Sequence, residues 1–292
     1  MSSITSVLRR RPREADSRPG GLGPTPVSYT VLIILGLFAF LPVLVLLFNS
    51  LKSSYEIGIN PLGLPSELDW SNFADAWRQG NMARGFVNTT ILVAGTIVGT
   101  WICAGSAAYA LARLDLPFKR GIETYLFVVI SLPVQMFIVP LFFLWVQLHL
   151  INTLFGLIII YVATSTPFSV LLLRTFLVGI PRELDEAARL DGANEFQVAT
   201  RVILPLSWPG FLTVGLVSGL GAYSELLFAV TFLIDPTLFP VATSFLQFSS
   251  GFTQLYNLVN AAGVIIVLPL IALFLVMQRR FIAGLATGGT KG

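Results

Sequence analysis

Long stretches without a charged residue alternate with short polar segments along the chain. Residues 85–112, 124–173 and 236–278 contain no Asp, Glu, Lys or Arg. A helix that crosses a hydrocarbon layer about 30 Å thick needs about 20 apolar residues. Each stretch is long enough for at least one such helix, so the pattern predicts membrane-spanning helices.

The stretch 124–173 is too long for one crossing, and a polar break at 149–152 divides it into two. We predict one membrane domain, residues 29–280, with six membrane-spanning helices. Prolines inside several of these spans are tolerated in membranes, because neighbouring helices and waters satisfy the freed carbonyls. The six spans are residues 29–48, 86–112, 124–148, 152–173, 203–232 and 261–280.

Lysine and arginine are concentrated in alternate segments between the spans. If the N-terminus is cytoplasmic, 15 of the 18 basic residues lie on that side and only Lys52, Arg78 and Arg84 lie outside. Cytoplasmic loops carry an excess of basic residues, so we predict that both termini are cytoplasmic. The cytoplasmic segments are then 1–28, 113–123, 174–202 and 279–292.

Both ends of the chain are predicted to be cytoplasmic tails. Residues 1–28 are rich in Arg, Pro, Gly and Ser, bury little apolar surface, and are expected to be disordered. The run Arg9–Arg11 could touch anionic membrane lipid, although a tail that only helps to fix the topology is the simpler interpretation. Residues 281–292 form the C-terminal tail.

The composition narrows the class of protein. Hydrophobic residues make up 55% of the chain and charged residues only 11%, whereas soluble domains have about 25% charged residues. The mean hydropathy is +0.81. A soluble enzyme, a disordered protein, a coiled coil and a disulfide-stapled secreted module are therefore excluded, and an all-α, multi-spanning membrane protein remains.

Little in the sequence indicates catalysis or cofactor binding. The single cysteine, Cys103, forms no internal disulfide, and the single histidine, His149, has no partners for a metal site. We predict no catalytic residues, no metal ligands and no cofactor. A net charge of +3 is too small to indicate nucleic-acid binding. The ATP-binding signature is absent because the chain has no Gly-Lys dipeptide, so any ATP is bound by another chain.

One cytoplasmic segment, residues 181–192, has the pattern of a short, well-capped helix. Pro181 suits the first helical position, where its missing N–H costs nothing. Glu183, Asp185 and Glu186 place negative charge in the first turns, where the helix dipole favours it. Gly192 suits the left-handed residue that ends a helix.

The same helix carries a small apolar stripe, formed by Leu184, Ala187, Ala188 and Ala193. The alanines would let another surface approach closely, so the helix could dock into a partner protein. An amphipathic helix that lies on the membrane surface has the same pattern. The residue pattern by itself leaves both interpretations open.

The segment also carries a longer motif. Glu186-Ala187-Ala188, then Gly192, then Leu204-Pro205 at the expected distance follow the pattern E-A-A-x-x-x-G-x(9)-I-x-L-P, with Val202 in place of the usual Ile. This motif resembles that of permease subunits of bacterial ATP-binding-cassette (ABC) importers. Residues 50–57, 108–120, 181–184 and 278–285 resemble the MalG-like carbohydrate permeases in particular. The resemblance covers residues 29–292.

This resemblance implies a type I (MetI-like) permease fold in a prokaryotic plasma membrane. It implies a homologous MalF-like permease subunit, two ATPase subunits that bind ATP and Mg, and an extracytoplasmic solute-binding protein. The solute would be a sugar, oligosaccharide, polyol or glycerol-phosphate derivative, and this chain would be non-catalytic. The residues implied in coupling to the ATPase are Pro181, Arg182, Glu183, Leu184, Glu186, Ala187, Ala188, Gly192, Leu204 and Pro205.

Two further sets of residues are candidates for contact with the solute or its carrier. In relatives, the loop between the last two spans reaches into the binding protein. Here that loop contains Phe239, Pro240 and Thr243, although it could also be an ordinary membrane-surface loop. Relatives carry Trp-Asn where Tyr223-Ser224 stands, so substrate contacts do not carry over directly. Candidates for the translocation path, chosen for aromatic or polar character at membrane depth, are Gln135, Phe137, Phe142, Gln147 and Glu225.

Three other kinds of membrane protein are alternatives to a carbohydrate permease. An ion-coupled secondary transporter would need no docking helix and would have more carboxylates within its spans than Glu225. A membrane enzyme would need a cluster of reactive side chains at one depth. An ABC permease for a non-sugar solute would share the motif, because the sequence does not identify the solute.

Overall fold

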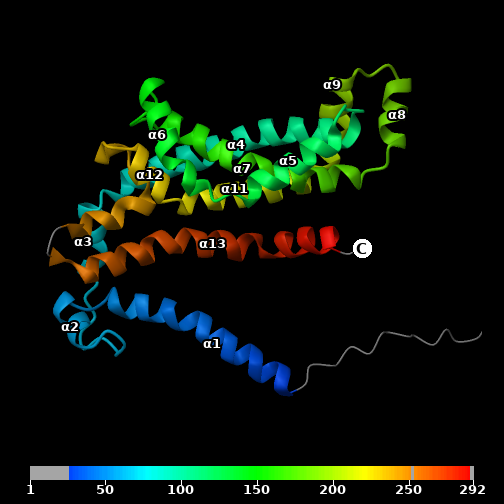
Figure 1. The fold of residues 1–292 in the computed structure, drawn as a ribbon. Coiled ribbons are helices and arrows are strands. Elements are labelled where there is room, and N and C mark those ends of the chain that lie inside the picture. The colour runs from blue at the N-terminus through cyan, green and yellow to red at the C-terminus, as the bar shows by residue number, and fades with distance from the viewer. Residues whose placement is uncertain (1–25, 251–252, 290–292) are drawn as a thin grey trace, which may run out of the picture. The chain divides into compact units, whose positions relative to one another are not determined.

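The computed structural model describes residues 26–250 and 253–289, which are predominantly helical (Figure 1). Of the η segments, η2 is a π-helix and the others are 3-10 helices. The elements in chain order are α1 (Pro26–Asn49), α2 (Ser54–Ile59), α3 (Ser71–Gln79), α4 (Met82–Arg113), α5 (Lys119–Ser131), η1 (Val134–Phe137), α6 (Ile138–Gln147), α7 (Leu154–Val178), α8 (Glu183–Leu190), α9 (Glu195–Gln197), η2 (Val198–Ile203), α10 (Leu204–Leu206), α11 (Trp208–Ser224), α12 (Leu227–Phe232), η3 (Pro236–Leu238), η4 (Val241–Phe248), β1 (Ser249–Ser250), β2 (Thr253–Gln254) and α13 (Tyr256–Gly289).

Four described helices are long and apolar enough to cross a membrane, and there are six crossings if each of two bent helix pairs counts as one. The four are α1, α4, α7 and the first part of α13. The bent pairs are α5 with η1 and α6, and the α9–α10 segment with α11. Of the N-terminal tail expected at residues 1–28, residues 1–25, including Arg9–Arg11, lie outside the described residues, and residues 26–28 belong to α1. Of the C-terminal tail expected at residues 281–292, residues 281–289 continue α13.

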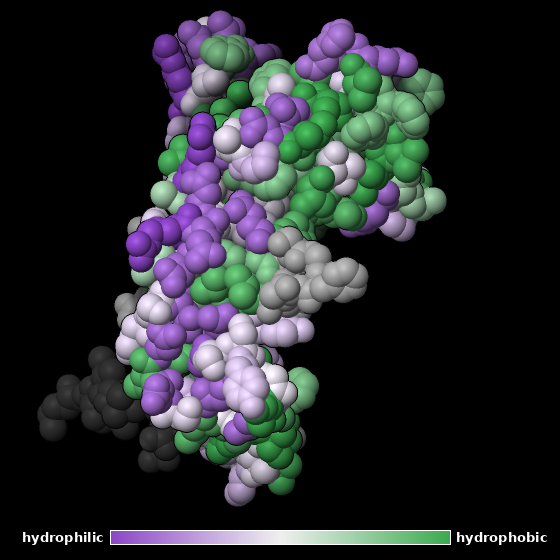
Figure 2. Space-filling model, turned by 90° about the vertical axis from the view of Figure 1, so that its left-hand side faces the viewer, coloured by the Kyte–Doolittle hydropathy of each residue, from purple (hydrophilic) through white to green (hydrophobic). Residues whose placement is uncertain are grey.

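The chain divides into two compact units, residues up to Val45 and residues from Leu46 onward. In the first unit, nearly every described residue of α1 is exposed, and most of these residues are apolar. A helix that is hydrophobic all round is suited to a membrane. The second unit contains the remaining elements, and broad areas of exposed hydrophobic side chains lie beside areas of hydrophilic ones on the face shown in Figure 2.

Helix α4 packs between α7 and α11 at the centre of the second unit (Figure 1). Glycines allow this close packing. A Cβ atom added at Gly99 of α4 would lie 2.5 Å from a methyl group of α7, and one added at Gly215 of α11 would lie 2.9 Å from Trp101 of α4. Each glycine has a second glycine four positions away, at Gly95 and Gly219. Such small-residue spacing lets membrane helices approach closely.

The third predicted span, 124–148, is sharply bent. Helix α5 and the η1–α6 segment meet at an angle of 88°. The break falls at Leu132, whose extended backbone (φ −82°, ψ 133°) precedes Pro133. Proline disfavours helical geometry in the residue before it, which accounts for the position of the bend.

The fifth predicted span, 203–232, is divided into several helices. The segment that ends in η2 and α10 meets α11 at 76°, and the chain leaves helical geometry again at Glu225 before the short α12. Pro205 and Pro209 flank the first break and lack the N–H groups that a continuous helix requires. Helix α11 therefore spans only Trp208–Ser224, shorter than the predicted run.

Polar side chains join α13 to α3 and to the segment after α1. The Asn257 amide donates to Asn72 Oδ1 (2.7 Å), and the Ser54 hydroxyl donates to Asn257 Oδ1 (2.6 Å). Asn72 in turn donates to the carbonyls of Ser50 and Lys52, both at 3.0 Å. These bonds connect residues that are distant in the sequence, so they fix the start of α13 on the rest of the unit.

We expect Asn257→Ala to lower the thermal stability of the detergent-solubilised protein. The substitution removes the donor to Asn72 Oδ1 and the acceptor of the Ser54 hydroxyl, and a buried polar group without a partner costs about 1–3 kcal/mol. The matched control is Asn260→Ala, which removes only a bond to the Tyr256 carbonyl in the same helix. Equal unfolding temperatures for the two variants would contradict the structural role of Asn257.

Candidate functional site

Helix α8 is the short helix predicted at residues 181–192. It begins at Glu183 with acidic residues in its first turn and ends after Leu190. Pro181 therefore lies two residues before the helix and not at its first position, because Arg182 is the N-cap residue. Gly192 has φ +87°, its N–H bonds to the Arg189 carbonyl, and the N–H of Ala193 reaches back to the Ala188 carbonyl. This pair of bonds is the Schellman arrangement, which needs a left-handed residue at the position of Gly192.

Most side chains of α8 are exposed. Glu186 and Ala187 are exposed, and Leu190 has 89% of its surface accessible. Asp185 and Ala188, three positions apart, face inward instead, with Asp185 buried and Ala188 packed against the core around α4 and α7. The apolar stripe predicted for docking is therefore split between the two faces, because Ala188 and Ala193 contact this chain's own core.

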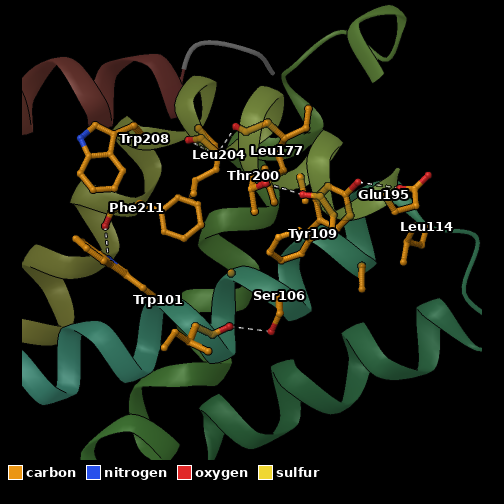
Figure 3. Close-up of a pocket in the computed structure, with 17 residues that line it drawn as sticks. Trp101, Ser106, Tyr109, Leu114, Leu177, Glu195, Thr200, Leu204, Trp208 and Phe211 are labelled. Atoms are coloured by element: carbon orange, nitrogen blue, oxygen red, sulfur yellow. Dashed lines mark hydrogen bonds between the residues drawn. The ribbon is translucent and has the colours of Figure 1, made fainter. Parts of the chain in front are cut away.

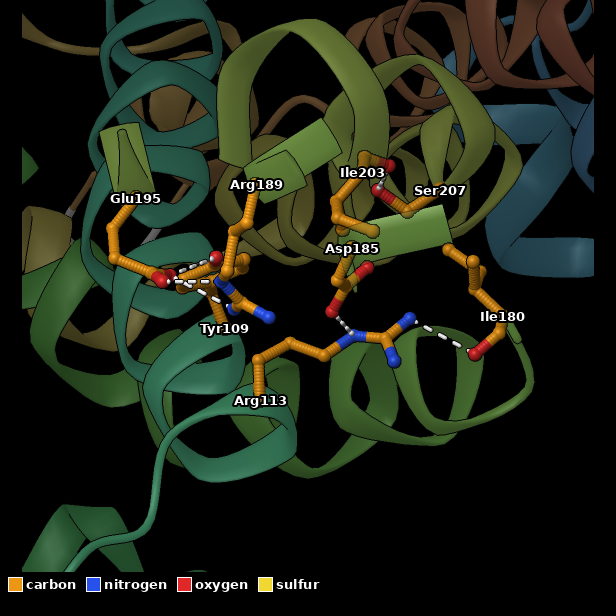
Figure 4. A network of polar contacts seen from close by, with 8 residues as sticks. All are labelled: Tyr109, Arg113, Ile180, Asp185, Arg189, Glu195, Ile203 and Ser207. Carbon is orange, nitrogen blue, oxygen red and sulfur yellow. Dashed lines mark hydrogen bonds and ion pairs between the residues drawn. The ribbon is translucent and has the colours of Figure 1, made fainter. Parts of the chain in front are cut away.

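Asp185 forms an ion pair with Arg113, the last residue of α4 (Figure 4). Arg113 Nε lies 3.4 Å from Asp185 Oδ2, and the two side chains are only 2% and 4% exposed. The other end of the guanidinium donates to the Ile180 carbonyl at 3.0 Å. A buried ion pair fixes geometry, because removing one partner leaves an uncompensated buried charge.

A second polar link on the same side is exposed. Arg189 Nε donates to Glu195 Oε1 at 2.7 Å, and the Tyr109 hydroxyl of α4 donates to Glu195 Oε2 at 3.0 Å (Figure 4). Exposed pairs contribute only about 0–1 kcal/mol. The buried Arg113–Asp185 pair is the stronger constraint on α8.

The motif residues Leu204 and Pro205 follow the π-helix η2, which carries the chain from α9 towards α11. Val198 and Ile203 of η2 are buried in the same core cluster as residues of α4 and α7. Pro205 is exposed and Leu204 partly buried. Single π-helical turns often occur at functional sites, and this one lies between α8 and the membrane helix α11.

A cavity of about 680 Å³ lies between α4, η2 and the start of α11 (Figure 3). Trp101, Trp208 and Phe211 lie at one end, and Tyr109 and Glu195 at the other. None of the five residues predicted for the translocation path lines it. Packing between α4 and the bent segment is therefore incomplete at this point.

The predicted binding-protein loop lies at the other end of α4. The Asn88 amide donates to the carbonyls of Thr237 (2.9 Å) and Phe239 (3.0 Å), and the N–H of Val241 donates to the Thr89 hydroxyl at 2.9 Å. Pro240 and Thr243 are buried, and Phe239 is partly buried. The loop is thus bound to α4.

A local hydrogen bond also shapes this loop. The N–H of Thr237 donates to Asp235 Oδ1 at 2.8 Å. This bond stabilises the carboxylate and lowers the pKa of Asp235 below its ordinary value.

The predicted translocation-path residues fall into two groups. Gln135, Phe137 and Gln147 are exposed on η1 and α6. Phe142 packs edge-on against Phe232 of α12, with ring centroids 6.0 Å apart. Glu225 accepts bonds from the Leu227 and Phe228 N–H groups that begin α12, and from the Tyr161 hydroxyl at 3.4 Å. Of the five predicted path residues, only Phe142 and Glu225 are therefore shown to contact the same element, α12.

The sequence interpretation missed the role of Arg113 and of Asn88. Arg113 ends an uncharged run, and the prediction used it only for topology and as part of the resembling segment 108–120. Its burial beside Asp185 was not predictable from local pattern. Asn88, a polar residue inside an apolar span, was the signal that could have indicated a helix-to-loop contact, since polar groups within membrane segments need partners.

We expect Asn88→Ala to loosen the loop at residues 236–243, because the carbonyls of Thr237 and Phe239 lose their donor. Hydrogen–deuterium exchange of that loop should become faster. Thr90→Ala is the matched control, since the Thr90 hydroxyl bonds only within its own helix. Unchanged exchange in Asn88→Ala would contradict the anchoring role.

Known proteins resemble nearly the whole chain. The family model described as "Binding-protein-dependent transport system inner membrane component" matches residues 101–286. A diacetylchitobiose uptake system permease protein of Streptomyces coelicolor is 32% identical and aligns over 90% of this chain and 88% of its own. A melibiose/raffinose/stachyose import permease protein of Bacillus subtilis is 31% identical, over 87% and 92%.

The fold also matches a solved structure. A bacterial ABC transporter involved in alginate import has a chain with a TM-score of 0.74 at 22% identity, covering 87% of this chain and 95% of that one. This likeness confirms the predicted MetI-like fold, and the family match confirms the predicted membrane location. Together with the permease motif that runs from α8 to Leu204-Pro205, these matches show that the chain belongs to the inner-membrane components of binding-protein-dependent transport systems.

Proposed function

We propose that this chain is the membrane-spanning subunit of an ABC importer for a carbohydrate, and that α8 couples it to ATP hydrolysis on a separate subunit. The observation that carries the proposal is the exposed helix α8, whose C-terminal end is capped at Gly192 and whose outer face carries Glu186, Ala187 and Leu190. The carbohydrate class is supported by the two relatives above, whose names refer to oligosaccharide uptake.

The family implies a second permease subunit, ATPases and a solute-binding protein. We propose the following contacts between this chain and those partners. A MalF-like permease pairs with it, and α8 occupies a cleft in one of two ATPase subunits. Glu186 pairs there with a basic side chain, while Ala187 permits close approach. ATP and Mg are bound by the ATPases, so this chain needs no cofactor and is non-catalytic.

On the opposite side of the membrane, the loop that contains Phe239, Pro240 and Thr243 faces the binding protein in this proposal, through exposed residues such as Pro236, since Pro240 and Thr243 themselves are buried. Phe142 and Glu225 flank the nearby α12 and are the path residues best placed to contact solute. The two residues contact opposite ends of α12, Glu225 at its start and Phe142 at Phe232. An aromatic ring suits the apolar face of a sugar, and a carboxylate suits its hydroxyl groups. Gln135, Phe137 and Gln147 remain candidates on the exposed face of η1 and α6.

An ion-coupled secondary transporter is the less favoured alternative. Such a protein has no use for an exposed helix shaped for an ATPase. Within the described spans, Glu225 is held by backbone N–H groups of α12, a capping arrangement that accounts for this carboxylate without ion coupling. An importer of the same family for a non-sugar solute is separated from our proposal by the uptake assay below.

We expect Glu186→Ala and Gly192→Asp to leave the protein inserted but to reduce solute uptake at least tenfold, by removing a charged contact and by straining a left-handed residue. Uptake and ATP hydrolysis are measured in proteoliposomes with the partner subunits and a panel of labelled sugars. Asp115→Ala, an exposed acid outside α8, is the matched control. Normal uptake in both α8 variants would refute the coupling role, and uptake restricted to non-sugars would refute the substrate class.

We also expect both termini to be cytoplasmic, which places Ser66 outside. In a Cys103→Ser background, a cysteine introduced at Ser66 should react with an impermeant thiol reagent from outside the cell. One introduced at Asp115 should react only after the membrane is opened. The reverse labelling pattern would overturn the topology.

A further inference from the structure

Helix α8 is attached to the membrane core by few contacts. Among its residues only Asp185 is buried, and Ala188 adds a partly buried contact. Helix α8 also packs against η2 and is joined to α9 by the exposed pair of Arg189 and Glu195. A displacement of α8 can therefore reach the spans through η2 and the backbone, which lead to α11, or through Asp185, which contacts α4.

Arg113 attracts Asp185 by charge across 3.4 Å, and neither Arg113 Nε nor Asp185 Oδ1 has a hydrogen-bond partner among the described residues. Its guanidinium lies against Asp185 in the first turns of α8 and also donates to the Ile180 carbonyl in the turn before α8. One side chain thus contacts both α8 and the turn that precedes it. The pair is shielded from solvent, since both side chains are nearly fully buried, so salt screens it much less than an exposed pair.

Stability alone does not account for such a pair. Well-packed apolar residues in place of a buried ion pair are often neutral or stabilising. An ion pair differs from an apolar contact in that its electrostatic attraction is lost as the two charged groups move apart, which opposes displacement of one element from the other. The specific contribution of the charges is a fixed position of α8 relative to the end of α4.

Helix α4 then connects two distant places. At its C-terminal end, Arg113 contacts Asp185 of α8. Near its beginning, Asn88 and Thr89 bind the loop at residues 237–241. At a rise of about 1.5 Å per residue, the helix between Asn88 and Arg113 is about 37 Å long. That length exceeds the hydrocarbon thickness, so one continuous helix joins the two sides of the membrane.

We propose that the Arg113–Asp185 pair clamps α8 to α4, and that α4 carries the displacement of α8 across the membrane to the loop bound by Asn88 and Thr89. Arg113 is then a positioning residue for coupling. The proposal rests on the proposed role of α8, and it adds the route from α8 to the loop that faces the binding protein.

The first test replaces the pair by apolar residues, Arg113→Met with Asp185→Leu, in the complete reconstituted transporter. Three quantities are measured: retention of the ATPase subunits, uptake per ATP hydrolysed, and hydrogen–deuterium exchange of α8 and of residues 236–243 with and without ATP and vanadate. We expect the ATPases to be retained, uptake per ATP to fall about tenfold, and the ATP-dependent change to persist in α8 but vanish in the loop.

The matched control is Arg174→Met with Glu123→Leu. This ion pair has a 2.9 Å separation and joins α7 to α5 instead of α8 to α4. The same chemical replacement there should leave uptake per ATP within about twofold of wild type. An equal loss in both double variants would show a general effect of removing ion pairs and would overturn the proposal.

The second test restores the link by a different bond. Cysteines at positions 113 and 185, in a Cys103→Ser background, are joined by a short bifunctional thiol reagent. We expect the unlinked protein to be uncoupled and the linked protein to recover uptake. Equal, wild-type uptake with and without the link would overturn the proposal, as would failure of every pair-less variant to assemble, because the pair would then be a folding element only.

The exchange measurements separate this inference from the proposed function. If ATP leaves exchange of α8 unchanged in the wild-type complex, α8 is not the coupling helix and the proposed function fails. If α8 responds to ATP and the loop responds equally with and without the pair, only the route through α4 fails.

Discussion

The close packing of α4 against α7 and α11 is the contact on which the rest of the second unit depends. It is made possible by glycines at the helix interfaces, where a single added carbon would meet a neighbouring side chain. In a membrane, water does not drive such helices together, so van der Waals contact between closely spaced surfaces has to do so. Once α4 is fixed, both of its ends become attachment points, for α8 on one side and for the loop after α12 on the other.

Buried polar interactions lie largely towards the ends of this helical core. Asn72, Asn257 and Lys52 join segments at one end, and Arg113 and Asp185 do so at the other. Apolar contacts and glycines dominate between them. Burying a polar group costs less free energy near the aqueous boundary than at the centre of the membrane, which explains this division. The polar links also specify which elements meet and in what register.

The sequence predicted the parts of the fold that are encoded locally. Uncharged runs predicted the apolar helices, and the acidic first turn and Gly192 predicted α8 together with its Schellman ending, although Pro181 lies before the helix. The break inside 203–232 was not predicted, because the hydrophobic run continues through Ser207 and Glu225 while the backbone does not. The predicted span followed the length and hydropathy of the run and did not treat Pro205 and Pro209 as helix breaks.

The sequence predicted where α8 lies along the chain, but not which of its side chains face inward. The motif placed α8, yet the inward turn of Asp185 and Ala188 depends on Arg113 and the core around α4, which are remote in sequence. The buried state of Pro240 and Thr243 likewise depends on Asn88 and Thr89. Contacts between distant segments leave little trace in a single sequence, because each partner alone resembles an ordinary polar residue in a span or a turn.

The exposure of Leu190 has a consequence for assembly. A subunit made without its ATPase presents this leucine, with Leu184 and Ala187 nearby, to water. Exposed apolar groups of this kind mark a surface for association and, in a cell, chaperones and proteases continuously remove incompletely folded or sticky chains. In the proposed transporter, the surface by which α8 would bind the ATPase is therefore also the surface that marks an unassembled copy of this chain.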